Sequence, residues 1–129
     1  MSTPETDPGP HHTFIFDRVV TNIGGNYNHH TGIFTATESG VYVFSWTVFC
    51  YDGSYYDSQL IMNSDVVGGI TCRSLNSGYY FLNSGSTIVV LQLNSDDVVY
   101  VRTHATHGTN GQILSKDHVR TSFTGWKFL

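Results

Sequence analysis

The chain alternates between short runs rich in β-branched and aromatic residues and clusters of Gly, Asn, Asp and Ser. No stretch carries the hydrophobic repeat of a helix over a convincing length. Short apolar runs separated by turn-forming residues predict an all-β sandwich, barrel or jelly roll. The expected strands are residues 13–20, 32–36, 41–50, 58–63, 65–74, 86–93, 98–105 and 120–129.

Periodicity separates two kinds of strand. Residues 98–105 alternate, with Val, Thr and Ala on the odd positions and Tyr, Arg and His on the even ones. This pattern is typical of a strand with one face in a core and the other in water. Residues 86–93 and 41–50 differ, because both of their faces are apolar. In 41–50 one side carries Tyr42, Phe44, Trp46, Val48 and Cys50, and the other carries Val41, Val43 and Phe49.

The second apolar face of these strands needs a cover. Each sheet of a two-layer sandwich buries only one face, and no helix is expected that could lie over the other. Another copy of the same protein is the economical cover, so the pattern favours a closed homo-oligomer. The alternative is that long loops hide these side chains within one chain.

Composition and charge narrow the possible partners. A chain of 129 residues is long enough for one domain with a sizeable core. Six Lys and Arg against ten Asp and Glu give a net charge of −4, without a basic cluster. Nucleic-acid binding needs several cations that neutralise phosphates, so we expect none, and no apolar run is long enough to insert into a membrane. The two cysteines, Cys50 and Cys72, fit either one bridge or two buried thiols.

Catalysis and metal binding have little support. Nucleophilic catalysis would need a Ser or Cys held against a His and an orienting acid, and the known motifs are missing. Asp96 and Asp97 lie between two expected strands, where Asp is typical of a turn. The seven histidines fit exposed loops, and the sharper alternative is a pH-sensitive trimer. We therefore expect no enzyme, no metal site and no cofactor.

Spaced residues along nearly the whole chain carry a family resemblance. An aromatic residue is followed six positions later by Asn, then by further aromatics and by Gly-x-Tyr-x-Phe; these are Phe16, Asn22, Tyr27, Phe34, Gly40, Tyr42 and Phe44. The stretches "LQLNSDDVVYV" and "TSFTGWKF" match the family's last strands. From Thr13 to Leu129 the chain thus resembles the globular head domain of complement component C1q, with Trp46 as a mild departure.

The resemblance implies a ten-strand jelly-roll sandwich of the tumour necrosis factor type, assembled as a homotrimer. The family's opening strand has no counterpart, so we expect residues 1–12 to be a tail or remnant and residues 13–129 to be a single domain. Calcium, which some members bind, is not expected, because "YYFLNSGS" lacks the carboxylate. Aromatics expected in the core or at trimer contacts are Tyr42, Phe44, Trp46, Phe49, Tyr80, Phe123, Trp126 and Phe128.

In function, the chain resembles stand-alone secreted members of invertebrates, especially molluscs, which are regarded as pattern-recognition proteins of innate immunity. The resemblance implies an extracellular, lectin-like, non-enzymatic homotrimer that binds microbial glycans or other surface patterns. One alternative is a trimeric ligand for a cell-surface receptor, like tumour necrosis factor or an adipokine. A structural or storage component of a matrix is another.

Two polar segments, residues 51–57 and 104–112, are the expected ligand-binding loops. Tyrosine rings stack on the C–H surfaces of sugars, while carboxylates and amides accept hydrogen bonds from hydroxyls. The alternative for Tyr55 and Tyr56 is packing at a subunit contact. The candidates are Tyr51, Asp52, Tyr55, Tyr56, Asp57, Arg73, His104, His107 and Asn110.

Overall fold

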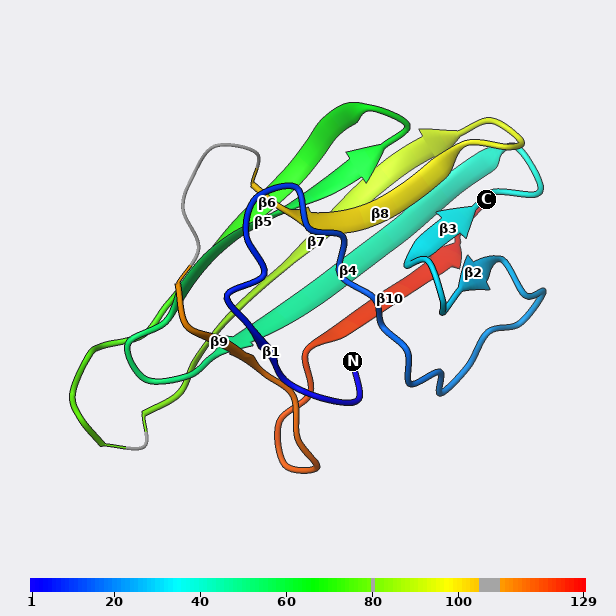
Figure 1. The fold of residues 1–129 in the computed structure, drawn as a ribbon. Helices are drawn as coiled ribbons and strands as arrows, with labels where there is room; N and C mark the ends of the chain where they lie inside the picture. The colour runs from blue at the N-terminus through cyan, green and yellow to red at the C-terminus, as the bar shows by residue number, and fades with distance from the viewer. Residues whose placement is uncertain (80, 105–109) are drawn as a thin grey trace.

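The computed structural model describes residues 1–79, 81–104 and 110–129, and these contain ten β-strands. The strands form two antiparallel five-stranded sheets that face each other (Figure 1), which confirms the expected all-β sandwich. Within the described ranges, no helix is long and apolar enough to span a bilayer. The strands are β1 (Glu5–Thr6), β2 (Tyr27–Asn28), β3 (Ile33–Thr35), β4 (Gly40–Cys50), β5 (Tyr55–Met62), β6 (Asp65–Arg73), β7 (Asn83–Leu93), β8 (Val98–Thr103), β9 (Gln112–Leu114) and β10 (Ser122–Lys127).

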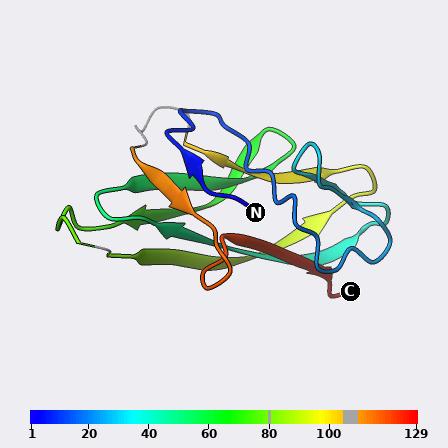
Figure 2. The same ribbon diagram turned by 60° about the horizontal axis from the view of Figure 1, so that its bottom comes forward.

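The long strand β4 lies in the middle of one sheet. It pairs along its whole length with β7 on one side and with β10 and β9 on the other, and β1 pairs with β9. The second sheet has the order β2-β3-β8-β5-β6. We call these the β4 sheet and the β8 sheet; Figure 2 shows them as two layers.

The core lies between the two sheets and is filled by one face of each strand. Trp46 of β4 is buried there, and its Nε1 donates a hydrogen bond to Ser58 Oγ at 2.9 Å. The ring of Phe44 stacks on Phe123 of β10 with centroids 5.8 Å apart. The alternation expected for β8 is also confirmed. Its buried side chains are Val99, Val101 and Thr103.

A disulfide joins the two sheets. Cys50 ends β4, Cys72 lies in β6, and their Cα atoms are 6.1 Å apart. Both residues are buried at one end of the core. Of the two possibilities that the sequence left open, the structure contains the bridge.

Part of the outer face of the β4 sheet is apolar and open to solvent. Ile88 and Val90 of β7 are 60% and 63% exposed, and Trp126 of β10 is 48% exposed. The described loops leave these three side chains uncovered, whereas Val43 of β4, which lies between Val90 and Trp126, is buried within the chain. Single exposed apolar residues are ordinary, but a contiguous apolar sheet face marks an interaction surface.

The first residues pack against the β4 sheet. The side chain of Met1 is buried, and its amine donates a hydrogen bond to the carbonyl of Thr121 at 3.2 Å. Strand β1 follows and pairs with β9. The segment that we expected to be a tail thus contributes a two-residue strand and one core side chain.

Two stretches differ from the expected strands. Residues 13–20 form a single bridge, between Thr13 and Arg102, and then leave the sheet. Residues 55–57, expected in a loop, begin β5, because pairing with β6 extends that far and alternation carries Tyr56 into the core. This second difference changes the orientation of three candidate ligand residues.

Candidate functional site

Four of the candidate residues lie together on the outer face of the β8 sheet. In β5, Tyr55 and Asp57 alternate with the core residue Tyr56, so they point away from the core. Pairing with β6 places Arg73 opposite Tyr55, and the amide of His104 donates to the Asp57 carbonyl at 2.8 Å. Thr71 is the partner of Asp57 in β6. We call this group the Tyr55–Arg73 patch: Tyr55, Asp57, Thr71, Arg73 and His104.

Arg73 is held loosely between an aromatic ring and a carboxylate. Its Cζ lies 5.3 Å from the centroid of the Tyr55 ring, and one terminal nitrogen lies 3.9 Å from Asp57 Oδ1. The side chain is 63% exposed, so such an ion pair adds little stability. A guanidinium has five N–H donors in a fixed fork, and most of them remain available to an external acceptor.

Asp57 is the buried member of the patch. Its side chain is only 12% exposed, and Thr71 Oγ1 donates to its Oδ1 at 2.7 Å. The hydrogen bond from Thr71 of β6 holds this carboxylate in place, and Arg73 lies close to it. The Asp57 carboxylate is therefore ordered in the absence of a ligand, whereas the Arg73 side chain keeps its freedom.

A shallow hollow of about 300 Å³ adjoins the patch along β5 and β6, and Asp57, Thr71 and His104 line it. Gln59 also lines the hollow, and Arg102 is its partner in β8. Gln59 Oε1 and Arg102 Nε are buried side-chain atoms that have no hydrogen-bond partner within the described part of the chain. Buried polar groups are normally paired, so this acceptor and donor suit an internal water molecule.

Asp52 and the loop around it close one end of the sandwich. The Asp52 carboxylate accepts hydrogen bonds from the Ser77 hydroxyl at 2.7 Å, the Ser77 amide at 3.1 Å and the Gly78 amide at 3.0 Å. The Ser77 hydroxyl, followed by these two amides, holds the pKa of Asp52 below its usual value. Asp52 therefore organises the β6–β7 loop, although the sequence suggested contact with a ligand.

The other candidate residues have different positions. Tyr56 is buried, its hydroxyl donates to the carbonyl of Gly111, and burial raises its pKa, so its ring cannot stack on an external sugar. Tyr51 is half-buried in the β4–β5 turn, and Asn110 exchanges backbone hydrogen bonds with Tyr55 at 3.0 Å. His107 and Tyr80 lie outside the described residues.

The aromatic residues expected at the core or at trimer contacts divide between the two faces of the β4 sheet. Those in the core are Tyr42, Phe44 and Trp46. Phe49 and Phe123 are half-buried, while Trp126 and Phe128 are exposed. Phe123 lies opposite the core residue Trp46 and packs against the core, whereas Trp126 lies opposite Val43 on the outer face.

Sequence reasoning missed Thr71, Gln59 and Arg102. Each lies on the side of its strand that faces away from the core, and the alternation of β8 already predicted that Arg102 faces solvent. What the sequence lacked was the register that brings Gln59 opposite Arg102 and Asp57 opposite Thr71. As for metals, residues 1–79, 81–104 and 110–129 contain no cluster of three or more His, Cys, Asp or Glu able to hold an ion.

Comparisons with known proteins agree with this architecture. Residues 1–128 match the C1q domain. The globular domain of zebrafish complement 1qA superposes with a TM-score of 0.66 at 19% identity, covering 98% of this chain and 94% of that one. The crystal structure of murine APRIL at pH 5.0 gives a TM-score of 0.66 at 14% identity, covering 93% of this chain and 88% of that one.

These structural matches support the jelly roll of the C1q and tumour necrosis factor type, but not the molluscan subgroup. The match to the C1q domain spans nearly the whole chain, and the family assignment is based on it. The chain belongs to the C1q domain family.

Proposed function

We propose that the protein is a secreted, homotrimeric recognition module that binds glycans or related surface patterns without catalysis. The C1q domain family is non-enzymatic, and members of the C1q and tumour necrosis factor families typically trimerise. The observation that carries the ligand proposal is the Tyr55–Arg73 patch with its neighbouring hollow, which combines an aromatic ring, an exposed guanidinium and a carboxylate.

The outer face of the β4 sheet supports the homotrimer. Val43 lies between Val90 of β7 and Trp126 of β10, which makes an apolar row across three strands. Further along β4, Thr47 lies between Ser86 and Ser122, and its hydroxyl is 2.9 Å from that of Ser86. Packing of such faces around a threefold axis would bury the apolar row and leave the hydroxyl row able to bind water.

The ligand patch lies on the other sheet, so the assembly and recognition surfaces do not compete. Sugar hydroxyls both donate and accept hydrogen bonds, which suits the polar side chains of Asp57 and Thr71 that line the hollow. The exposed fork of Arg73 would select sugars that carry a carboxylate or a sulfate. Three such sites on one rigid body would convert weak single contacts into useful avidity.

The buried Cys50–Cys72 bridge supports an extracellular location. Disulfides persist in oxidising compartments and are rare in the reducing cytosol. This argument concerns the environment of the folded domain and is independent of its ligand.

A glycan array probed with the labelled protein tests the function, together with binding to whole bacteria. We expect binding concentrated on acidic saccharides, with competition by the free sugar. A blank array combined with no bacterial binding would contradict the proposal. Saturable binding to host cells that free sugars cannot displace would instead favour a receptor ligand.

A further inference from the structure

The loop between β6 and β7, described at residues 74–79, 81 and 82, exposes large apolar side chains. Leu75 is 66% exposed, Tyr79 81% and Phe81 41%. Figure 1 shows that this loop projects beyond the sheets at the end of the sandwich opposite the C-terminus. We call these three side chains the Leu75–Phe81 surface. Apolar side chains that gather on one loop, instead of being scattered singly, indicate a contact surface.

Hydrogen bonds fix the backbone of this loop against the turn between β4 and β5. The Gly53 amide donates to the carbonyl of Leu75 at 2.9 Å. The amide of Tyr79 donates to the Ser77 hydroxyl at 3.2 Å, and that hydroxyl donates to Asp52 at 2.7 Å. Leu75 and Tyr79 are therefore presented to solvent by a fixed backbone, so little ordering is needed when the loop makes a contact.

The loop carries no charge. Residues 74–95 include no Asp, Glu, Lys or Arg, although the chain has sixteen of them in its six basic and ten acidic residues. The charged side chains next to the loop have opposite signs: Arg73 precedes it, and Asp52 is hydrogen-bonded to it. The loop can thus leave water without desolvating an ion, and its surroundings match a surface without net charge. The net charge of −4 opposes approach to an anionic surface.

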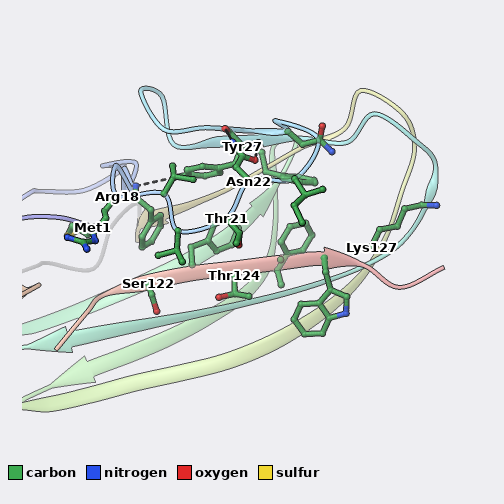
Figure 3. Close-up of a pocket in the computed structure, with 18 residues that line it drawn as sticks. Met1, Arg18, Thr21, Asn22, Tyr27, Ser122, Thr124 and Lys127 are labelled. Carbon is green, nitrogen blue, oxygen red and sulfur yellow. Dashed lines mark hydrogen bonds between the residues drawn. The ribbon is translucent and has the colours of Figure 1, made fainter. Parts of the chain in front are cut away.

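The Leu75–Phe81 surface is not part of either described cavity. A cavity of about 690 Å³ lies beside β10 (Figure 3), and the hollow of about 300 Å³ lies along β5 and β6. No described residue of the loop lines either of them. Side chains that project without enclosing a space suit a deformable apolar phase better than a single small molecule. Leucine and phenylalanine partition into hydrocarbon, and tyrosine favours the boundary between hydrocarbon and water.

We propose that the Leu75–Phe81 surface docks the protein on the interface of a zwitterionic lipid bilayer, of which phosphatidylcholine is the example. The contact is peripheral, because three side chains enter the headgroup region and no segment crosses the bilayer. This activity goes beyond the recognition of glycans. It uses neither the Tyr55–Arg73 patch nor the outer face of the β4 sheet.

Co-sedimentation with sucrose-loaded phosphatidylcholine vesicles tests the proposal. We expect saturable binding that is the same at about 0.1 M and about 0.5 M NaCl, because it does not depend on charge. Phosphatidylserine added to the vesicles should not tighten it. No binding to phosphatidylcholine at millimolar lipid would overturn the proposal. Binding that requires phosphatidylserine and is lost at high salt would also overturn it, because it would show an electrostatic attachment.

Exposed positions supply the variant and its matched control. Leu75→Ser should weaken vesicle binding about tenfold, because it removes a leucine that would be buried in lipid. Ile23→Ser changes an aliphatic side chain that is 94% exposed in the segment before β2, at the other end of the sandwich (Figure 1), and should leave binding unchanged. Both variants should keep the urea midpoint of the wild type. Equal loss of binding in the two variants would show general adhesion of exposed apolar residues and would overturn the proposal.

A tryptophan introduced into the loop reports its contact with lipid. In Tyr79→Trp, phosphatidylcholine vesicles should shift the emission to shorter wavelength, and brominated acyl chains should quench it. The wild type gives the background, which comes from the buried Trp46 and the half-exposed Trp126. A variant whose emission changes no more than that of the wild type would contradict contact at this loop.

A protein on the cell surface is the other possible occupant. Binding to cells that is abolished by protease treatment of those cells, without binding to vesicles, would indicate a protein partner and would overturn the proposal. Phosphatidylcholine vesicles carry no sugar, and Leu75→Ser should leave the signals of the glycan array unchanged. Lipid docking and glycan recognition can therefore fail separately.

Discussion

The ring of Phe44 lies directly against the backbone of Gly125 in the neighbouring strand. A Cβ atom on Gly125 would lie 2.7 Å from Cδ1 and 2.9 Å from Cε1 of that ring. Phe44 is fully buried and is held from the other side by Phe34 and Tyr42, so it cannot move away freely. Glycine at position 125 is therefore required by the aromatic core and not by a turn.

Gly125→Ala should destabilise the domain by about 1–3 kcal/mol, the usual cost of overpacking a filled core. Urea unfolding followed by tryptophan fluorescence measures this free energy, with the buried Trp46 as a reporter of the core. Gly69→Ala is the matched control, because its Cβ would meet only the Ser58 carbonyl, at 3.4 Å. Equal losses in the two variants would show that steric contact with Phe44 is not the cause.

Removal of the disulfide should lower the free energy of unfolding by about 3 kcal/mol. The bridge closes a loop across a sequence separation of 22 residues and restricts the unfolded chain. The Cys50→Ala, Cys72→Ala double variant and the reduced wild-type protein should have similar urea midpoints. A double variant as stable as the oxidised wild type would contradict the prediction.

Val90→Asp should prevent the proposed trimer. The side chain is 63% exposed in one chain but would be buried in the assembly, where an unpaired carboxylate is costly. Sedimentation velocity at micromolar concentration should show single subunits for this variant and trimers for the wild type. Val66→Asp, on an exposed position of β6, is the control and should remain trimeric. A wild-type protein that is monomeric at this concentration would contradict the proposed homotrimer.

Arg73→Ala should reduce binding to acidic saccharides at least tenfold, because it removes the guanidinium that lies beside Tyr55. Lys116→Ala removes an exposed cation outside the patch and should leave array signals unchanged. If both variants lose binding equally, attraction by overall charge and not the Tyr55–Arg73 patch explains the signal.

The loop held by Asp52 should loosen in acid. Because hydrogen bonds from Ser77 and Gly78 lower the pKa of Asp52, its contribution to folding is present at neutral pH and is lost as the pH falls below about 4, through the folded-state pKa. The amide proton shifts of Ser77 and Gly78 should titrate in that range. In Asp52→Asn these two shifts should become independent of pH, and an unchanged titration would contradict the role of Asp52.

Much of the fold could be predicted because side-chain alternation is a local property. The even positions of β4 and the odd positions of β8 are buried as their patterns require. The exposed apolar face of β7 was also visible in Ile88 and Val90. The strand expected at residues 13–20 was wrong. The alternation there arises because Phe14 and Phe16 are both buried in the core, although their segment forms only one bridge to a sheet.

The candidate site was predictable by composition but not by geometry. The sequence marked Tyr55, Asp57, Arg73 and His104 as recognition residues, yet it assigned the first two to a loop and grouped Tyr56 with them. Once β5 begins at Tyr55, alternation separates Tyr56 from its neighbours. A shift of one residue in a strand reverses every side chain, so small errors in strand boundaries become large errors in a site.

The sequence by itself determined the all-β class, the two-faced apolar strand and the family, because these depend on residue types at short and regular spacings. Only the tertiary structure decided the Cys50–Cys72 bridge and the register that places Arg73 beside Tyr55. These features join residues that are distant along the chain. Their positions depend on which strands pair and in which register, and that is set by the packing of the whole core.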